Sequence, residues 1–476
     1  VLPGGVLLHS MFREFVMQTE DCSEQKDIEL LIAAAIDGGD RSPVGVARAV
    51  GRLVSEGQLS GGERLPTVRT LARVLRLSPT SVAEAWSALK RAGTIVTDGR
   101  RPTFVRDRTD RAGGGRAWRV PVESGVYEVD LSTGTPDPAL LPSIGTILET
   151  LGADPVVTSY LDRPVLSELE LLLLDRWPFV PERLTVVNGA LDAVDRLIAA
   201  SVEMGDRVVV ENPTFAPIGD LLERAGAEVI GVKLDEEGIV VEDLAAALAH
   251  RPRLLILQPR AHNPTGIGMT ANRAQALAGL LADTDTVVIE DDHSGAVAGA
   301  DLHTLGVHLP GQVVHIHSFS KAYGPDLRLA AVGGASEPID ELIRRRQLGP
   351  SWSSRLLQAI LLRLLTDPGT DELLEASAAM YSRRRRLLID ALAENGIELA
   401  GGSGFNLWLP VHDEQWALVA LASRGIGVAP GSPFQIGPAD GPHVRITTAR
   451  VVDGFEELAG HLADAAGATT HRSLPA

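Results

Sequence analysis

The sequence contains a single cysteine, Cys22, among its 476 residues. One thiol forms no internal disulfide and builds no cysteine-based metal cluster, so we expect a protein of a reducing compartment, a cytoplasmic one. The chain also lacks an apolar run of the roughly 18 residues that cross a bilayer, which argues against a membrane protein. No basic segment precedes the short apolar patch at the start, so a signal peptide is not expected.

Basic charge is scarce overall but concentrated in one segment. The formal net charge is −18, yet residues 41–111 contain 14 Arg and Lys against 6 Asp and Glu. This segment therefore carries +8, and the rest of the chain carries −26. An acidic body repels polyanions, so a basic module attached to it points to nucleic-acid binding, although a solvated basic surface has the same charge.

The length of the chain indicates more than one domain, because a single hydrophobic core stops growing at ~250–300 residues. We predict five segments. They are a poorly specified N-terminal extension (1–40), a small domain (41–106), a polar, glycine-rich linker (107–128), a large domain (129–467) and a C-terminal tail (468–476).

The small domain has the pattern of three helices followed by a hairpin. Apolar residues recur at helical spacing after Ser42 and Pro43, which resemble an N-cap and the first helical position. Thr67 and Ser78 stand as caps before the second and third helices. β-prone runs then flank a Gly/Pro turn near residues 98–102. Three helices and a β-wing form a winged helix-turn-helix.

The large domain alternates helical patterns with short apolar strands. Examples of the strand-like runs are RLTVVNG, DRVVVENP, AEVIGV, RLLILQP, TVVIEDD and QVVHIHSFS. This alternation predicts an α/β fold with a mainly parallel sheet. Ligand-binding residues in such folds gather at the carboxyl ends of the strands.

The stretch SFSKAYGPDLRLA places Lys321 directly after one of these strands. Because burying an ammonium group is costly, a lysine there suits a Schiff base with a carbonyl cofactor such as pyridoxal phosphate. The hydroxyls of Ser318 and Ser320 and the guanidinium of Arg328 suit a phosphate dianion. Alone, Lys321 also fits a surface lysine followed by a structural arginine.

Four further stretches place suitable groups beside strand ends. Asn263 in NPTG can donate to a phenolate oxygen on a cofactor ring, and Asp291 can pair with a protonated pyridine nitrogen. Gly189 and Ala190 open a helix whose backbone N–H groups suit a phosphate, and Phe215 offers a flat apolar face. Each residue alone also fits a turn, a cap or the core.

The small domain resembles the GntR family of winged-helix DNA-binding proteins in RLPTVRTLA, SPTSVAEAWSALKRAG and GRRPTFV. The resemblance implies a set of DNA-contacting residues: Arg69, Ser78, Thr80, Ser81, Gly99 and Arg100. Two arginines common in that family's recognition helix are replaced by Pro79 and Ala83. A winged helix that serves only dimerisation or domain packing is the alternative.

Residues 130–465 resemble the fold-type I aminotransferases in the order of Gly189, Phe215, Asn263, Asp291, Lys321 and Arg328. The resemblance implies that Gly134 lies in a substrate-side loop and that Arg445 binds a substrate carboxylate. It also implies that Tyr160 reaches the phosphate of a partner subunit across a dimer.

Four histidines lie near these candidate site residues in the sequence, and one of them differs from the family pattern. His293 stands where the family usually has a tyrosine against the cofactor's phenolic oxygen. An imidazole there is expected to change charge near neutral pH. The remaining histidines near the site, His262, His315 and His317, are expected to lack the spacing and the acidic partners of a metal site and to be structural, so no metal is predicted.

A GntR-type head joined to an aminotransferase-like body resembles the MocR-type transcriptional regulators. The resemblance implies a pyridoxal-phosphate-dependent regulator and a domain-swapped homodimer that binds double-stranded operator DNA. It would sense an amino-acid-like amine, or pyridoxal phosphate itself, by aldimine exchange at Lys321. The alternative is an aminotransferase with a secondary DNA-binding head, so enzymatic activity stays open.

Overall fold

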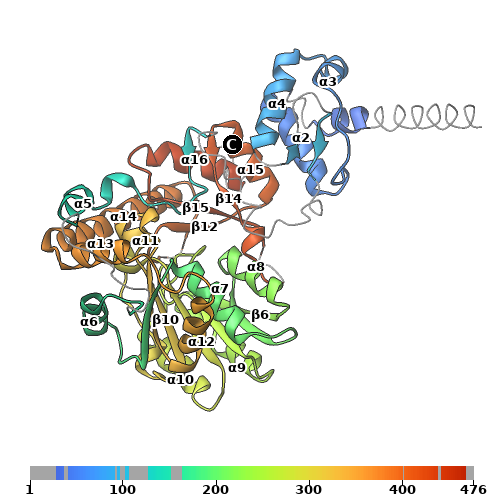
Figure 1. The fold of residues 1–476 in the computed structure, drawn as a ribbon. Helices are drawn as coiled ribbons and strands as arrows, with labels where there is room; N and C mark the ends of the chain where they lie inside the picture. The colour runs from blue at the N-terminus through green and yellow to red at the C-terminus, as the bar shows by residue number, and fades with distance from the viewer. Residues whose placement is uncertain are drawn as a thin grey trace, which may run out of the picture. The chain divides into compact units, whose positions relative to one another are not determined.

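The computed structural model describes residues 28–36, 41–91, 94–96, 102–106, 127–151, 163–399, 401–437 and 441–467. The chain divides into two compact units, whose elements are labelled in Figure 1. The head unit combines Val1–Asp130 with Val411–Pro430, and the body unit combines Leu131–Pro410 with Gly431–Ala476. Within the described ranges, no helix combines the length and the apolarity that crossing a membrane requires.

The head unit contains the winged helix-turn-helix that the sequence predicts. Its elements are α2 (Pro43–Ser55), α3 (Val68–Leu75), α4 (Pro79–Arg91), β1 (Ile95–Val96) and β2 (Phe104–Val105). The two strands pair antiparallel as the wing.

Side-chain caps begin the three helices, as predicted. The hydroxyls of Ser42, Thr67 and Ser78 each accept a hydrogen bond from the backbone N–H three residues on, at 3.1, 3.2 and 3.0 Å. These bonds satisfy N–H groups that have no partner within the helix. The helices then bury Val50 and Leu89 between them.

The head unit also includes a helix from a distant part of the sequence. α15 (Glu414–Ser423) packs against α2 and α4. After it, β13 (Ile426–Gly427) pairs in parallel with β3 (Val129–Asp130), and β14 (Ala429–Pro430) follows. A segment of about twenty residues near the C-terminus thus completes the unit that holds the winged helix.

An eight-stranded sheet in the order β4-β11-β10-β9-β8-β5-β6-β7 forms the centre of the body unit. Its strands are β4 (Arg183–Val187), β5 (Arg207–Asn212), β6 (Glu228–Asp235), β7 (Gly238–Ile239), β8 (Leu254–Leu257), β9 (Val287–Asp292), β10 (Val313–Ser318) and β11 (Ala330–Gly334). The pairings from β6 through β5, β8 and β9 to β10 are parallel. In this sheet, antiparallel pairing occurs towards the two edges, where β11 lies between β10 and β4, and β7 pairs with β6. The mainly parallel sheet is therefore confirmed.

Helices cover both faces of the sheet because its central strands are apolar on both sides. Val208 and Val210 face one layer, made of α7 (Ala190–Ser201), α8 (Ala216–Ala225) and α12 (Ser336–Gln347). Val209 faces the other layer, made of α9 (Val241–Leu248) and α10 (Ala271–Leu281). This period-two alternation decides on which face each polar side chain of β9 and β10 lies.

The remaining helices of the body unit are α5 (Gly145–Leu151), α6 (Ser167–Asp175), α11 (Ser320–Tyr323), α13 (Arg355–Thr366), α14 (Pro368–Glu394) and α16 (Phe455–Ala466). A third apolar cluster joins α6, α13 and α14 to Phe319, at the end of β10. Near the C-terminus, β12 (Asn406–Pro410) pairs antiparallel with β15 (His443–Thr447). This pairing sets Arg445 opposite Trp408.

Candidate functional site

The predicted site residues of the body unit lie at the carboxyl ends of its strands. Lys321 lies on α11, three residues after β10 ends, and Asp291 is the penultimate residue of β9. Gly189 caps α7 directly after β4, and Phe215 precedes α8 after β5. Asn263 lies in the loop after β8. The topology therefore brings residues that are far apart in sequence to one edge of the sheet.

The Lys321 ammonium group contacts His293 directly. Lys321 Nζ lies 2.7 Å from His293 Nδ1, and the opposite ring nitrogen, Nε2, lies 3.0 Å from the carbonyl oxygen of Ala261. Because a carbonyl only accepts, the hydrogen-bond network assigns the ring proton to Nε2 and makes Nδ1 the acceptor from Lys321. Ser294 Oγ also lies 3.1 Å from Nδ1.

The electrostatics of this pair shift the pKa of both groups towards the neutral form. Burial lowers the pKa of Lys321 to about 8, although the charge of Asp291 acts in the opposite direction. Burial, and then the charge of Lys321, hold the pKa of His293 well below 6.5. The expectation that His293 changes charge near neutral pH is therefore wrong, because that expectation assumed an exposed imidazole rather than a buried one beside an ammonium.

Only one of the two carboxylate oxygens of Asp291 accepts a hydrogen bond from a described residue. Its Oδ2 accepts a hydrogen bond from Gln258 Nε2 at 2.9 Å, whereas its Oδ1 is buried and has no hydrogen-bond partner among the described residues. Burial raises the pKa of Asp291 to about 6, against the hydrogen bond from Gln258 and the charge of Lys321. A buried carboxylate oxygen without a partner suits a cationic N–H donor supplied by a ligand.

Gln258 connects two of the predicted groups, and sequence reasoning missed it. Its Nε2 donates to Asp291, and its Oε1 accepts from the backbone N–H of Asn263 at 2.8 Å. Its own backbone N–H donates to Glu211 at 2.8 Å. The only sequence signal was its position at the end of the strand RLLILQP, which does not by itself reveal a bridging role.

Arg385 packs against the NPTG turn that carries Asn263, and sequence reasoning did not predict this contact. A Cβ atom at Gly266, in the NPTG turn, would lie 2.5 Å from Arg385 Nη2, so this glycine leaves room for the guanidinium. Burial lowers the pKa of Arg385 to about 10. An arginine in the middle of the 27-residue helix α14 gives no sequence signal for such a role.

Gly189 and Arg328 form the part of the site that suits a phosphate. A Cβ atom at Gly189 would lie 3.2 Å from Arg328 Nη2, and Gly189 has a φ of 100°, which disfavours other residues. The same guanidinium group lies 3.5 Å from the carbonyl oxygen of Asn188. Ala190 begins α7 at this point, Ser318 ends β10, and Ser320 begins α11. A helix N-terminus beside an exposed arginine is a common anion site.

Arg445 is buried on β15 and reaches the Asn263 loop. Its Nη1 donates to Asn263 Oδ1 at 3.3 Å, and its Nη2 donates to the carbonyl oxygen of Ser132. Gly134 follows two residues later, and a Cβ atom there would meet nothing within 4 Å. Arg445 also contributes to the lowered pKa of Lys321, so the two cations act on one site.

The predicted DNA-contacting residues of the head unit lie on α3 and at the start of α4. Arg69 is exposed on α3, and Ser78, Thr80 and Ser81 surround the first turn of α4, where Ser78 Oγ caps Ser81. The wing residues Gly99 and Arg100 lie outside the described residues, as does Tyr160 of the body unit.

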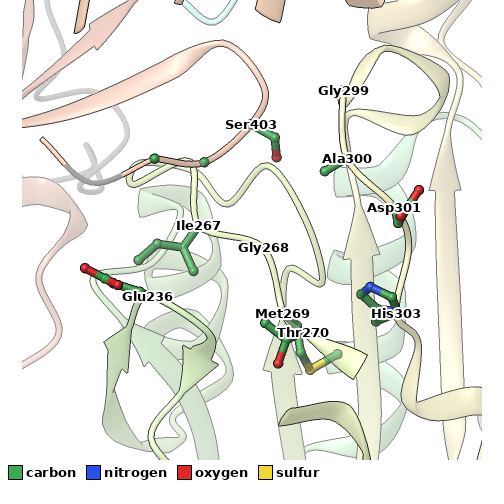
Figure 2. A pocket seen from close by; sticks show the side chains of 12 residues that line it. Glu236, Ile267, Gly268, Met269, Thr270, Gly299, Ala300, Asp301, His303 and Ser403 are labelled. Atoms are coloured by element: carbon green, nitrogen blue, oxygen red, sulfur yellow. The ribbon is translucent and has the colours of Figure 1, made fainter. Parts of the chain in front are cut away.

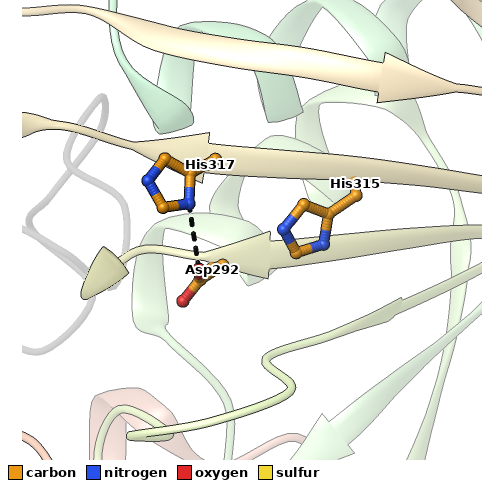
Figure 3. A group of neighbouring side chains, drawn as sticks. All are labelled: Asp292, His315 and His317. Carbon is orange, nitrogen blue, oxygen red and sulfur yellow. Dashed lines mark hydrogen bonds and ion pairs between the residues drawn. The ribbon is translucent and has the colours of Figure 1, made fainter. Parts of the chain in front are cut away.

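His317, His315 and Asp292 form a separate cluster on the opposite face of the sheet from Asp291. Their ligand-type atoms lie within 4.8 Å of one another, and His317 Nδ1 lies 3.2 Å from Asp292 Oδ2 (Figure 3). Arg260 holds both oxygens of Asp292, at 2.9 and 2.8 Å. Although burial acts to raise it, these hydrogen bonds hold the pKa of Asp292 well below 3.8. The expectation that the histidines lack acidic partners is wrong, because His317 contacts Asp292 and His315 contacts Glu290. We assign a structural role to the cluster, because Arg260 already pairs with both oxygens of Asp292.

A cavity of about 530 Å³ lies beside the NPTG loop (Figure 2). Residues 267–270, 299–301 and 401–403 line it, together with Glu236 and His303. Figure 2 shows both polar and apolar side chains around it, among them Glu236, Met269 and His303. It contains none of the predicted site residues, so the site at Lys321 is defined by its side chains and not by this cavity.

Comparison with protein families assigns both parts of the chain. Residues 127–462 match the family described as aminotransferase class I and II, and residues 44–105 match the family described as bacterial regulatory proteins, gntR family.

Individual relatives match across most of the chain. The chain is 35% identical over 402 residues to the vitamin B6 salvage pathway transcriptional repressor PtsJ of Salmonella typhimurium, covering 82% of this chain and 91% of the relative. It is 27% identical to the HTH-type transcriptional regulator TauR of Rhodobacter capsulatus, covering 80% and 88%. Among solved structures, a kynurenine aminotransferase of Pyrococcus horikoshii has a TM-score of 0.66 at 20% identity, covering 76% of this chain and 98% of that one.

Proposed function

We propose that this chain, which belongs to the aminotransferase class I and II family and carries a gntR-family domain, is a pyridoxal-phosphate-dependent, DNA-binding transcriptional regulator. This combination of domains is typical of MocR-type regulators. The observation that carries the proposal is the buried Asp291 Oδ1, which has no partner among the described residues and lies in the same site as a lysine of lowered pKa. The class I and II aminotransferases depend on pyridoxal phosphate.

The residues of the site fit pyridoxal phosphate. Asp291 would accept the N–H of its protonated pyridine ring, and the turn of Gly189 with Arg328 would hold its phosphate. Lys321 would attach to its aldehyde carbon, and Phe215 would pack on the ring. When bound, the cofactor supplies an electron-withdrawing ring on which amines are recognised covalently.

The chain's own groups then control the proton on Lys321. A lysine attacks a carbonyl only as the neutral amine, and a pKa of about 8 makes a sizeable neutral fraction available near neutral pH. Neutral His293 accepts a hydrogen bond from Nζ and so orients the amine. Asn263 and Arg445 lie beside each other on the side where an effector carboxylate would bind.

Two classes of effector are consistent with this arrangement. An amino-acid-like amine would place its carboxylate on Arg445 near Gly134, in exchange for the Lys321 attachment. Pyridoxal phosphate itself would be the signal if occupancy of the site sets the DNA affinity. The name of the Salmonella relative, a repressor of vitamin B6 salvage, favours the second class.

A complete aminotransferase is the alternative function. The presence of Asn263, Asp291, Lys321, Arg328 and Arg445 favours it. His293 argues against it, because its two ring nitrogens are engaged by Ala261 and Lys321, and it offers no phenol to a cofactor oxygen. We therefore propose at most weak transamination.

The remaining parts of the proposal concern DNA and assembly. Exposed Arg69 and the hydroxyls of Thr80 and Ser81 would contact double-stranded operator DNA, with α4 as the reading helix. The active form would be a domain-swapped homodimer of a cytoplasmic protein, in which Tyr160 completes the partner's phosphate site.

One titration tests the proposal. The cofactor-free protein is bound to a fluorescent fragment of its own promoter, and the affinity is measured again with pyridoxal phosphate and with a panel of amino acids. We expect the DNA affinity to change with the effector, because a ligand shifts an equilibrium only by its differential affinity for the two states. Steady production of oxo acid, with no specific DNA binding, would support the aminotransferase instead.

A further inference from the structure

A second cavity, of about 420 Å³, lies behind the turn that carries Lys321. Its wall includes Leu173, Trp177, His315, Phe319, Tyr323 and Leu374. His315 and His317 point to the face of the sheet opposite Asp291, so this cavity is separate from the proposed cofactor site. None of the residues assigned above to the cofactor or effector lines it.

Aromatic rings form a continuous wall in this cavity. The ring centroids of His317 and Phe319 lie 5.0 Å apart, and those of Phe319 and Tyr323 lie 5.9 Å apart. Trp177 meets His315 edge-on, with centroids 5.6 Å apart. Such a wall suits the flat apolar part of a ligand and the face-on approach of an organic cation.

Two polar atoms in this wall have no hydrogen-bond partner among the described residues. They are Nε2 of His315, which is completely buried, and Nε1 of Trp177. The ring nitrogens of His315 do not face the cavity, because Nδ1 lies 2.9 Å from Glu290 Oε2 and Nε2 is completely buried.

The mouth of the cavity carries an excess of negative charge. Asp371 and Glu375 are exposed, one helical turn apart on α14, and neither makes an ion pair with a described residue. Two arginines also line the cavity. Arg260 is already paired with both oxygens of Asp292, so Arg176 is the positive charge that opposes Asp371 and Glu375. Burial and then the charge of Asp371 raise the pKa of Tyr323 to about 12, which sets this carboxylate near the ring that ends the wall.

We propose that this cavity is a second small-molecule site, which binds an organic ammonium ion with an aromatic body. The ring would lie along Phe319 and Tyr323, and the cationic group would lie between Asp371 and Glu375. Phe319 and Tyr323 stand two residues before and two residues after Lys321. Occupancy of the cavity therefore acts on the turn that presents Lys321, and this second consequence rests on the proposed function.

Benzyltrimethylammonium is a suitable probe because a quaternary nitrogen cannot react with a carbonyl cofactor. Its binding to the cofactor-free full chain is measured by calorimetry and by saturation-transfer NMR, with phenylacetate as the anionic counterpart. We expect saturable binding of the cation at concentrations up to ~10 mM and none of the anion at the same site. Absence of saturable binding by the cation would overturn the proposal.

Variants at the rim locate the probe. The double substitution Asp371→Asn with Glu375→Gln is expected to weaken binding roughly tenfold or more, because it removes both carboxylates. Glu372→Gln, an exposed acid on the same turn of α14 that does not line the cavity, is the matched control and should bind normally. Equal binding by all three proteins would refute the site.

Two further measurements separate this site from the site of Lys321. Ala296→Trp, which adds volume at an exposed lining position, should block the probe, whereas Lys321→Ala should bind it as the wild type does. If Lys321→Ala abolishes binding, the probe occupies the cofactor site and the inference is wrong. If the probe binds but leaves the visible spectrum of the cofactor-loaded protein unchanged, the link to Lys321 is wrong and the binding site stands.

Discussion

The guanidinium carbon of Arg48 on α2 lies 4.1 Å from the centroid of the Trp416 ring on α15. Gln415, the preceding residue, donates to Thr94 Oγ1 at 2.9 Å, just before the wing begins. A Cβ atom at Gly51 would lie 3.4 Å from Val419, so the glycine permits close packing of the two helices. The winged helix thus packs against the segment Val411–Pro430, which continues at both ends directly into the body unit.

We expect a conformational change in the body unit to reach the winged helix through this contact. We predict that Trp416→Ala reduces the effect of the cofactor on DNA affinity by about 0.5–1 kcal/mol, the usual strength of an exposed cation–π contact. The measurement is the ratio of DNA dissociation constants with and without pyridoxal phosphate. Trp416→Phe, which keeps an aromatic face, should retain most of the ratio. An unchanged ratio in Trp416→Ala would show that the contact does not carry the coupling.

Asp291 should destabilise the cofactor-free protein and hold the cofactor. Its folded pKa of about 6 lies above the ordinary value of 3.8, so the unfolded chain ionises more readily and the stability falls as pH rises between these values. Asp291→Asn should therefore stabilise the cofactor-free protein at pH 8 by roughly 2–3 kcal/mol and have little effect at pH 4.

With the cofactor bound, the same substitution should act in the opposite direction, because Asp291 Oδ1 loses its charge toward the pyridine N–H. Thermal unfolding at both pH values, with and without pyridoxal phosphate, measures both effects. The substitution Gln258→Asn is not an equivalent control, because it shortens the bridge to Asn263. Ser294→Ala, which leaves Asp291 and Gln258 in place, is the better comparison. A destabilised cofactor-free Asp291→Asn protein would contradict the prediction.

Local signals in the sequence were sufficient for much of the fold. Ser42, Thr67 and Ser78 begin helices because a hydroxyl caps N–H groups within three residues, and such contacts depend only on neighbouring sequence. The six apolar runs became strands because their length and flanking turns fit strands better than helices. β11 gives a weaker strand signal than these runs because it is rich in glycine and alanine, AAVGG, and has little β-propensity.

Contacts between distant residues were not predictable in the same way. Lys321 and Asp291 could be paired through a family resemblance, but the bridge through Gln258 depends on the register of β8 beside β9. The place of α15 beside the winged helix depends on a contact across more than 300 residues, between Thr94 and Gln415. A single sequence carries no signal for such pairs, since each residue alone is ordinary for its helix or loop.

His293 is predicted to stay neutral throughout the range in which an exposed histidine titrates. Burial and the adjacent Lys321 hold its pKa well below 6.5. Nitrogen-15 NMR of labelled histidines should show one ring, absent in His293→Tyr, that carries its proton on Nε2 at pH 6 and at pH 8 alike. A resonance that is absent in His293→Tyr and that gains a second ring proton between pH 8 and pH 6 would mean that His293 titrates after all.

The basic head should bind DNA with a strong dependence on salt. Residues 41–111 carry a net charge of +8, and each phosphate neutralised by Lys or Arg releases counterions, so the affinity should fall steeply as salt is raised. Arg69→Ala should weaken binding to the promoter by ~1–3 kcal/mol and leave binding to random DNA nearly unchanged, if Arg69 contacts a base. Arg73→Ala, an exposed arginine one turn further along α3, is the matched control. Titrations at several salt concentrations distinguish the outcomes. An equal loss of affinity for both DNAs, with a shallower salt dependence, would make Arg69 a phosphate contact. No loss of affinity for either DNA would remove Arg69 from the DNA interface.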